Sequence, residues 1–103
     1  MNKQDPISIQ EIKTKVGKLA AQYGAERIYL FGSYARGEAK PESDIDLRVD
    51  KGQIRGFFAL GGLHSDLEES LGLHVDLLST DSMDDHFLSE IRNEEILLYG
   101  KEQ

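Results

Sequence analysis

The 103-residue chain has no cysteine, no long apolar run and no excess of basic residues, and each absence excludes a class of function. Without cysteine it has no disulfides, no thiolate nucleophile and no cysteine-based zinc site. It carries 12 Lys and Arg against 19 Asp and Glu, a formal net charge of -7. Such a surface repels a phosphate backbone, so direct nucleic-acid binding is not expected.

No apolar run approaches the roughly 20 residues that span a bilayer. The first seven residues include Asp5 and Pro6 in place of the apolar core of a signal peptide. We therefore expect a cytoplasmic protein without a membrane partner. Internal repeats, low-complexity tracts and Pro- or Ser-rich linkers are also lacking, so residues 1–103 are predicted to form a single domain.

The apolar residues that are present follow helical and strand spacing by turns, which predicts an α/β (α+β) fold in the order α-β-α-β-α-β-α. Ser8 and Glu11 form a capping-box pattern, and the helix that follows them is expected to end at Gly24. The other expected elements are a strand at 27–31, a helical turn at 33–37, a strand at 44–49, a helix at 54–71, a strand at 74–78 and a helix at 84–93. Residues 96–99 are too few to assign by periodicity.

The helix expected at 54–71 has two features that leave its structure open. Gly61 and Gly62 are candidate points for a break or a bend. Phe57, Phe58 and Leu60 are predicted to belong to the core-facing stripe, with an exposed partner surface as the alternative for part of it.

Two aspartates, Asp44 and Asp46, share one face of the strand at 44–49, while apolar residues occupy the other. Their backbones lie about 6 to 7 Å apart, so both carboxylates can converge on metal. A two-metal phosphoryl-transfer site needs such oxygen ligands, because one ion activates the attacking oxygen and the other stabilises the leaving group. Asp76, on another strand with apolar neighbours, is the expected third carboxylate, which ligates metal and helps to deprotonate the attacking hydroxyl.

Gly32 and Ser33 directly follow the strand at 27–31 and precede the helical turn. A glycine there lets backbone N–H groups approach an anion, so these two residues are predicted to bind the β- and γ-phosphates of a nucleotide. Arg36, one turn later, is expected to counter negative charge on the nucleotide or on an acceptor protein.

Each of these motifs is weak alone, since about one Asp-x-Asp pair is expected from composition by chance. A Gly-Ser pair at one fixed offset before Asp-x-Asp is far rarer and constitutes the strong signal. His64, His74 and His86 lack the spacing of a zinc site and are expected to be packing or surface residues. His74 is the one possible exception, because it faces the same way as Asp76.

The runs Leu30 to Gly37 and Ser43 to Leu47 resemble the minimal nucleotidyltransferases of the DNA polymerase β superfamily, whose signature is Gly-Ser, ten residues, Asp-x-Asp. Val75 to Leu78 is similar to the family's third acidic strand, and Ile96 to Tyr99 to its usual ending. The resemblance implies a small mixed β-sheet flanked by helices, with two Mg²⁺ ions and a nucleoside triphosphate bound by the three aspartates. ATP as the substrate is implied in the same way.

Stand-alone proteins of this size are similar to the antitoxin half of HEPN/MNT toxin–antitoxin pairs. In those pairs the nucleotidyltransferase transfers AMP from ATP to a tyrosine of the HEPN ribonuclease toxin and silences it. The chain is too short to include a second domain for an antibiotic, a tRNA end or a primer, which favours the same interpretation.

The leading hypothesis from the sequence is therefore a Mg²⁺-dependent nucleotidyltransferase that transfers AMP from ATP to a hydroxyl of a partner HEPN toxin. One alternative is a protein-binding antitoxin that masks a basic toxin surface without catalysis, through its charge and apolar patches. The other is a small-molecule nucleotidyltransferase of the aminoglycoside-modifying kind, completed by a second chain.

Overall fold

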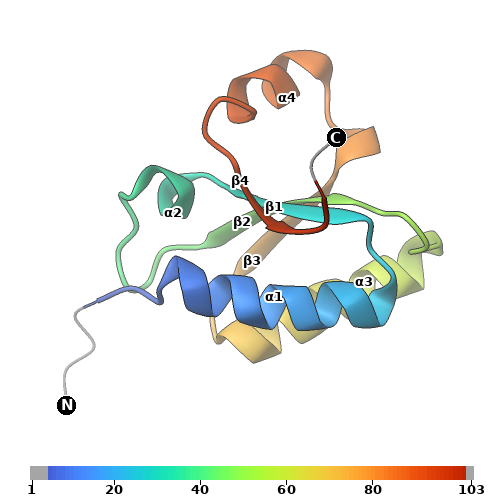
Figure 1. The fold of residues 1–103 in the computed structure, drawn as a ribbon, viewed down its shortest axis with the longest axis horizontal. Helices are drawn as coiled ribbons and strands as arrows, with labels where there is room; N and C mark the ends of the chain where they lie inside the picture. Colours follow the sequence, from blue (N-terminus) through green and yellow to red (C-terminus); the bar gives the residue numbers. More distant parts are fainter. Residues whose placement is uncertain (1–4, 102–103) are drawn as a thin grey trace.

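The computed structural model describes residues 5–101, which form a four-stranded sheet with helices on both of its faces (Figure 1). Along the chain the elements are α1 (Ile9–Tyr23), β1 (Arg27–Phe31), α2 (Ser33–Arg36), β2 (Ile45–Asp50), α3 (Gly56–Leu71), β3 (Val75–Ser79), the short 3-10 helix η1 (Thr80–Ser82), α4 (Asp85–Ile91) and β4 (Ile96–Tyr99). Within residues 5–101 no helix is both long and apolar enough to cross a membrane.

The strand order in the sheet is β3-β2-β1-β4. The β1 strand runs antiparallel to β2 and β4, whereas β2 and β3 are parallel, so the sheet is mixed, as predicted. Helices α1 and α3 lie side by side against one face, and α4 lies on the opposite side of the sheet (Figure 1). Because β2 and β3 are parallel, their N-terminal ends lie together at one end of the sheet, and the candidate site lies there.

Helix α1 begins and ends where the sequence predicts. The Ser8 side chain accepts a hydrogen bond from the Glu11 backbone N–H at 3.1 Å, which satisfies one of the free donors of the first turn. Gly24 ends the helix with a φ of 81°, a left-handed conformation that glycine adopts without strain. Between these ends, Ile12 and Val16 are fully buried against the sheet.

One face of the sheet provides the apolar core. Ile45, Leu47 and Val49 of β2 are completely buried beneath α1 and α3, while the residues that alternate with them point to the opposite face. On that opposite face, the ring of Phe87 from α4 packs edge-to-face on Phe31, with 6.1 Å between ring centroids. Helix α4 therefore covers only part of the second face, and polar side chains occupy the rest.

The predicted element order ends one strand too early. Residues Ile96–Tyr99 form β4, which pairs with β1 through partners such as Leu30 and Ile96. Four residues are too few to show a period, so only the pairing with β1 reveals this strand.

Helix α3 settles both features that the sequence leaves open. It continues unbroken through Gly61 and Gly62, so neither candidate point breaks the helix. Phe57 and Phe58 are 88% and 95% exposed, so the prediction that they face the core is wrong, and their exposed position fits the alternative of a partner surface. Leu60 is partly buried and packs against the core as predicted, and the fully packed stripe of α3 consists of Leu63, Leu67 and Leu71.

Candidate active site

The Asp-x-Asp pair lies where β2 begins. Asp44 directly precedes the strand with its side chain 55% exposed, and Asp46 is half-buried within it. Ile45 between them is fully buried in the core, which fixes both carboxylates on the opposite face. The predicted convergence of the two aspartates on one face is therefore present in the structure.

Asp76 reaches the same place from β3. In the parallel register of β2 and β3, Asp46 and Asp76 are direct partners. Val75 is fully buried, so Asp76 points away from the core, onto the face that carries the Asp-x-Asp pair. The structure thus gathers all three predicted carboxylates at one edge of the sheet.

Asp46 is the most buried of the three carboxylates. Burial, above all, together with the interaction with Asp76 and the charge of Asp44, raises the pKa of Asp46 to about 6, while Arg36 opposes the change. Carboxylates this close repel one another until a cation binds between them. Hard carboxylate oxygens are the ligands that Mg²⁺ prefers, so the donor set fits a divalent ion.

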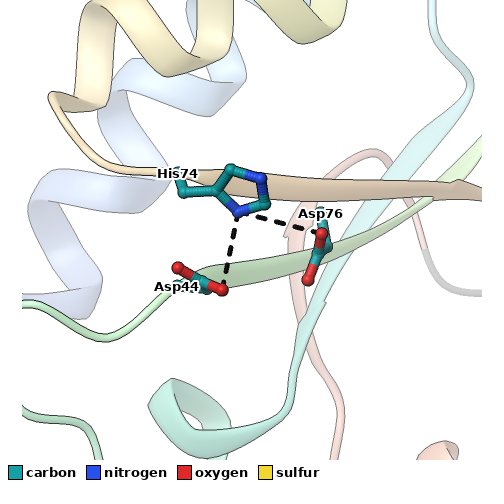
Figure 2. A group of neighbouring side chains, drawn as sticks. All are labelled: Asp44, His74 and Asp76. Carbon is teal, nitrogen blue, oxygen red and sulfur yellow. Dashed lines mark ion pairs between the residues drawn. The ribbon is translucent and has the colours of Figure 1, made fainter.

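A histidine joins this group. The Nδ1 atom of His74 lies 3.5 Å from Asp44 Oδ2 and 3.8 Å from Asp76 Oδ1. Figure 2 shows the imidazole directed at both carboxylates. Ligand-type atoms of these three residues all lie within 4.8 Å of one another, a spacing suited to metal binding. The outward direction of His74 matches the prediction that it faces the same way as Asp76.

The Gly-Ser turn contacts the carboxylates from the end of β1. Gly32 has a φ of 78°, and a Cβ at this position would overlap the Asp46 carboxylate, so glycine is required on both counts. Ser33 opens the short helix α2 directly after it and is half-buried. The turn and the Asp-x-Asp pair are therefore one packed unit, as their fixed spacing in the sequence indicates.

Glu94, in the loop before β4, contacts this turn at the side predicted to bind phosphate. Its Oε2 accepts a hydrogen bond from the Gly32 backbone N–H at 2.7 Å, and Arg36 Nη1 lies 3.2 Å from its Oε1. Arg36 also pairs with Glu38 at 3.0 Å. Nothing in the sequence marks Glu94, because its loop position gives no motif and the contact joins residues 62 positions apart. A carboxylate thus already contacts two groups expected to contact phosphate.

The far half of the same sheet face is polar but differently arranged. Arg48, only 3% exposed, contacts Glu95 through two nitrogens, at 3.0 and 2.6 Å, and donates to Thr80 at 2.8 Å. The guanidinium lies 4.1 Å from the centre of the Tyr29 ring. These residues line a cleft of about 700 Å³, with Asp50 among them. No motif in the sequence predicts this cluster.

A mixed sheet that presents an Asp-x-Asp pair beside a third carboxylate, with a Gly-Ser turn packed against them, is the arrangement of a nucleotidyltransferase. A model of the family described as polymerase beta, nucleotidyltransferase, matches residues 10–103 of this chain. The chain belongs to that family, and it is an enzyme of the nucleotidyltransferase class.

Named relatives of this chain belong to one kind of nucleotidyltransferase. A Methanocaldococcus jannaschii protein assigned as a protein adenylyltransferase is 39% identical over 90 residues, which cover 87% of this chain and 97% of the relative. The protein adenylyltransferase MntA of Thermococcus cleftensis is 42% identical over 66 residues, covering 64% of this chain and 67% of the relative. Sequence relatives of this chain are thus enzymes named for the transfer of AMP to protein.

Solved structures agree with this relationship. A crystal structure of a toxin–antitoxin pair with AMP-PNP matches with a TM-score of 0.77 and 29% identity, covering 88% of this chain and 75% of that one. A tri-AMPylated HEPN toxin of Shewanella oneidensis in complex with its MNT antitoxin matches with a TM-score of 0.70 and 26% identity, covering 89% of this chain and 72% of that one. The predicted nucleotidyltransferase fold is thereby confirmed.

Proposed function

We propose that this protein is the antitoxin of a toxin–antitoxin pair and transfers AMP from ATP to a tyrosine hydroxyl of a HEPN-type toxin. The observation that carries the proposal is the meeting of Asp44, Asp46 and Asp76 beside the Gly32 turn. The relatives support the acceptor class, since one similar structure contains an AMPylated HEPN toxin and another contains AMP-PNP.

The three aspartates would bind two Mg²⁺ ions together with the triphosphate. When bound, the ions supply positive charge that activates the attacking oxygen and stabilises the leaving pyrophosphate. Asp76 is 51% exposed at the mouth of the site, which suits a group that also orients the acceptor hydroxyl. The hydroxyl oxygen forms the new bond to the α-phosphorus, the bond to the β-phosphate oxygen breaks, and the hydroxyl proton passes to a nearby base.

The Gly32 turn and Arg36 would hold the β- and γ-phosphates. Gly32 offers a backbone N–H, Ser33 a hydroxyl and Arg36 a guanidinium, all donors suited to phosphate oxygens. For the triphosphate to bind these groups, Glu94 must release the first and the last of them. The exchange replaces one anion by another, so it does not leave either donor unpaired.

Intact-protein mass spectrometry tests the proposal. The protein is incubated with ATP, Mg²⁺ and a HEPN-type toxin, and the toxin is expected to gain the mass of one or more AMP units on tyrosine. A matched reaction with the Asp44→Asn, Asp46→Asn double variant should give no adduct. A toxin that stays unmodified yet is neutralised by this double variant would show that the protein acts by contact alone.

A further inference from the structure

His74 lies beside two of the three aspartates that would hold magnesium. It directly precedes β3 and has its side chain 59% exposed, on the face that also presents Asp76. Its Nδ1 lies between the carboxylates of Asp44 and Asp76, at 3.5 and 3.8 Å (Figure 2).

The separations lie close to those of ligands around a single ion. Six ligands at about 2.1 Å from an ion lie about 3.0 Å from their nearest neighbours and about 4.2 Å from the ligand opposite. The two Nδ1 distances of His74 fall between these values. Asp44, His74 and Asp76 are all exposed, so movements of less than about 1 Å bring the three ligand atoms onto one ion.

The second ring nitrogen of His74 faces a further carboxylate. Its Nε2 lies 3.9 Å from Glu68 Oε2, and Glu68 is itself held in place by a hydrogen bond from the Val75 backbone N–H at 3.0 Å. Histidines that bind metal commonly direct the other ring N–H to a carboxylate, which fixes the tautomer and the ring orientation. Glu68 lies where such an orienting group is needed.

We propose that His74 binds one of the two ions through Nδ1 and thereby makes the site favour Mn²⁺ over Mg²⁺. Imidazole nitrogen suits first-row transition ions, whereas Mg²⁺ strongly prefers oxygen, and both ions accept six ligands. The inference rests on the proposed function only in that the same carboxylates bind the metal. It adds a nitrogen ligand and a metal preference that three aspartates alone do not give.

Electron paramagnetic resonance with Mn²⁺ alone tests the proposal on the full chain. Pulsed spectra of the wild type should show coupling to a bound nitrogen, and His74→Gln should abolish it. His86→Gln is the matched control, because His86 is 86% exposed on α4 and pairs only with Glu90 among the described residues. In titrations that follow free Mn²⁺, His74→Gln should weaken Mn²⁺ binding about tenfold or more. Competition with Mg²⁺ should show less than about a threefold loss for that ion.

The outcomes separate failure of this inference from failure of the metal site itself. Bound Mn²⁺ without nitrogen coupling in the wild type overturns the role of His74 and leaves the carboxylate site intact. Equal losses of Mn²⁺ and Mg²⁺ affinity in His74→Gln overturn the selectivity. Mn²⁺ that fails to bind the wild type overturns the inference, and Mn²⁺ bound equally well by Asp44→Asn and the wild type overturns the proposed metal site.

Discussion

Asp46 and Asp50 lie four residues apart on the same face of the same strand, yet their environments are opposite. Burial, the interaction with Asp76 and the charge of Asp44 together raise the pKa of Asp46 to about 6, with burial as the largest cause. Burial also acts on Asp50, but a hydrogen bond from Thr80 and the guanidinium of Arg27 outweigh it and hold the pKa of Asp50 below its usual value. One carboxylate has anions as its main neighbours, and the other has cations and hydrogen-bond donors.

The difference divides this sheet face into two halves, according to whether the charges are paired within the protein. The half around Asp50 is internally neutralised, because Arg27 lies 2.8 Å from Asp50, and Arg48 pairs with both Asp50 and Glu95. Such a network positions the strands and needs no ligand. The half around Asp46 concentrates negative charge beside a glycine turn, and it becomes favourable only when a cation binds.

The largest effect should come from neutralising Asp46, in the half that concentrates negative charge. Asp46→Asn is expected to reduce AMP transfer at least about 1,000-fold, because it removes one of the proposed metal ligands of the phosphoryl-transfer site. The same change should raise the metal-free melting temperature, because it removes a repulsion. Transfer is measured by mass spectrometry of the acceptor, and melting by calorimetry in EDTA.

Asp50→Asn is the matched control on the same strand face. AMP transfer by this variant should stay within about threefold of the wild type when assayed well below its melting temperature, because Asp50 belongs to the ion-pair network and not to the proposed metal site. Equal losses of transfer in Asp46→Asn and Asp50→Asn would remove the distinction between the two halves. Full transfer by Asp46→Asn would refute the metal site.

The next largest effect should come from disrupting the ion-pair network around Asp50 and Arg48. Arg48→Met leaves Glu95, whose side chain is only 9% exposed, without its buried partner, and we expect a loss of about 3 kcal/mol in the free energy of unfolding. Urea denaturation measures this loss. The double variant Arg48→Met, Glu95→Leu should recover most of it, since no unpaired charge remains. A single variant as stable as the wild type would show that the network does not stabilise the fold.

A smaller effect should appear in the pH dependence of stability without metal. Because the folded state holds the proton of Asp46 up to about pH 6, ionisation of Asp46 destabilises the protein above that pH, and the penalty disappears as the pH falls toward 4. Solvent screens this half-buried group, so we expect Asp46→Asn to be more stable than the wild type by about 1 to 2 kcal/mol at pH 8.

Urea denaturation of both proteins in EDTA at pH 8 and pH 5 measures this difference. The advantage of Asp46→Asn should shrink as the pH falls from 8 to 5, and saturating Mg²⁺ should reverse it, because the ion stabilises only the ionised site. A stability difference that is the same at both pH values would show that Asp46 titrates normally in the folded protein.

Local signals in the sequence predict most of this structure. The strand at Arg27–Phe31 and the helix at Ile9–Tyr23 have the predicted bounds, because cap residues and apolar spacing mark them locally. The meeting of the Gly32 turn with the carboxylates was also predictable, since family resemblance links motifs that are distant in the chain.

What the sequence did not predict depends on packing between distant segments. The exposure of Phe57 follows from the rotation of α3 on the sheet, which places Leu63 and not the phenylalanines toward the core. The pairing of Arg48 with Glu95 depends on how the loop before β4 folds back over the sheet. Periodicity and composition say nothing about such contacts, because each residue looks like an ordinary surface charge or helix residue in the sequence.

The smallest effect should come from removing Glu94, which contacts both the Gly32 turn and Arg36. Glu94 already occupies the Gly32 N–H and pairs with Arg36, so the triphosphate must displace it. Glu94→Ala should therefore tighten binding of AMP-PNP with Mg²⁺ about 3- to 10-fold, a modest gain because Arg36 is 44% exposed and screened by solvent. Glu38→Ala is the control, since Glu38 pairs with the same arginine at 3.0 Å but makes no hydrogen bond to Gly32 in residues 5–101, and it should change affinity less than about twofold. Isothermal titration calorimetry measures both. Weaker binding by Glu94→Ala would mean that Glu94 holds the turn in its binding conformation and does not compete with phosphate.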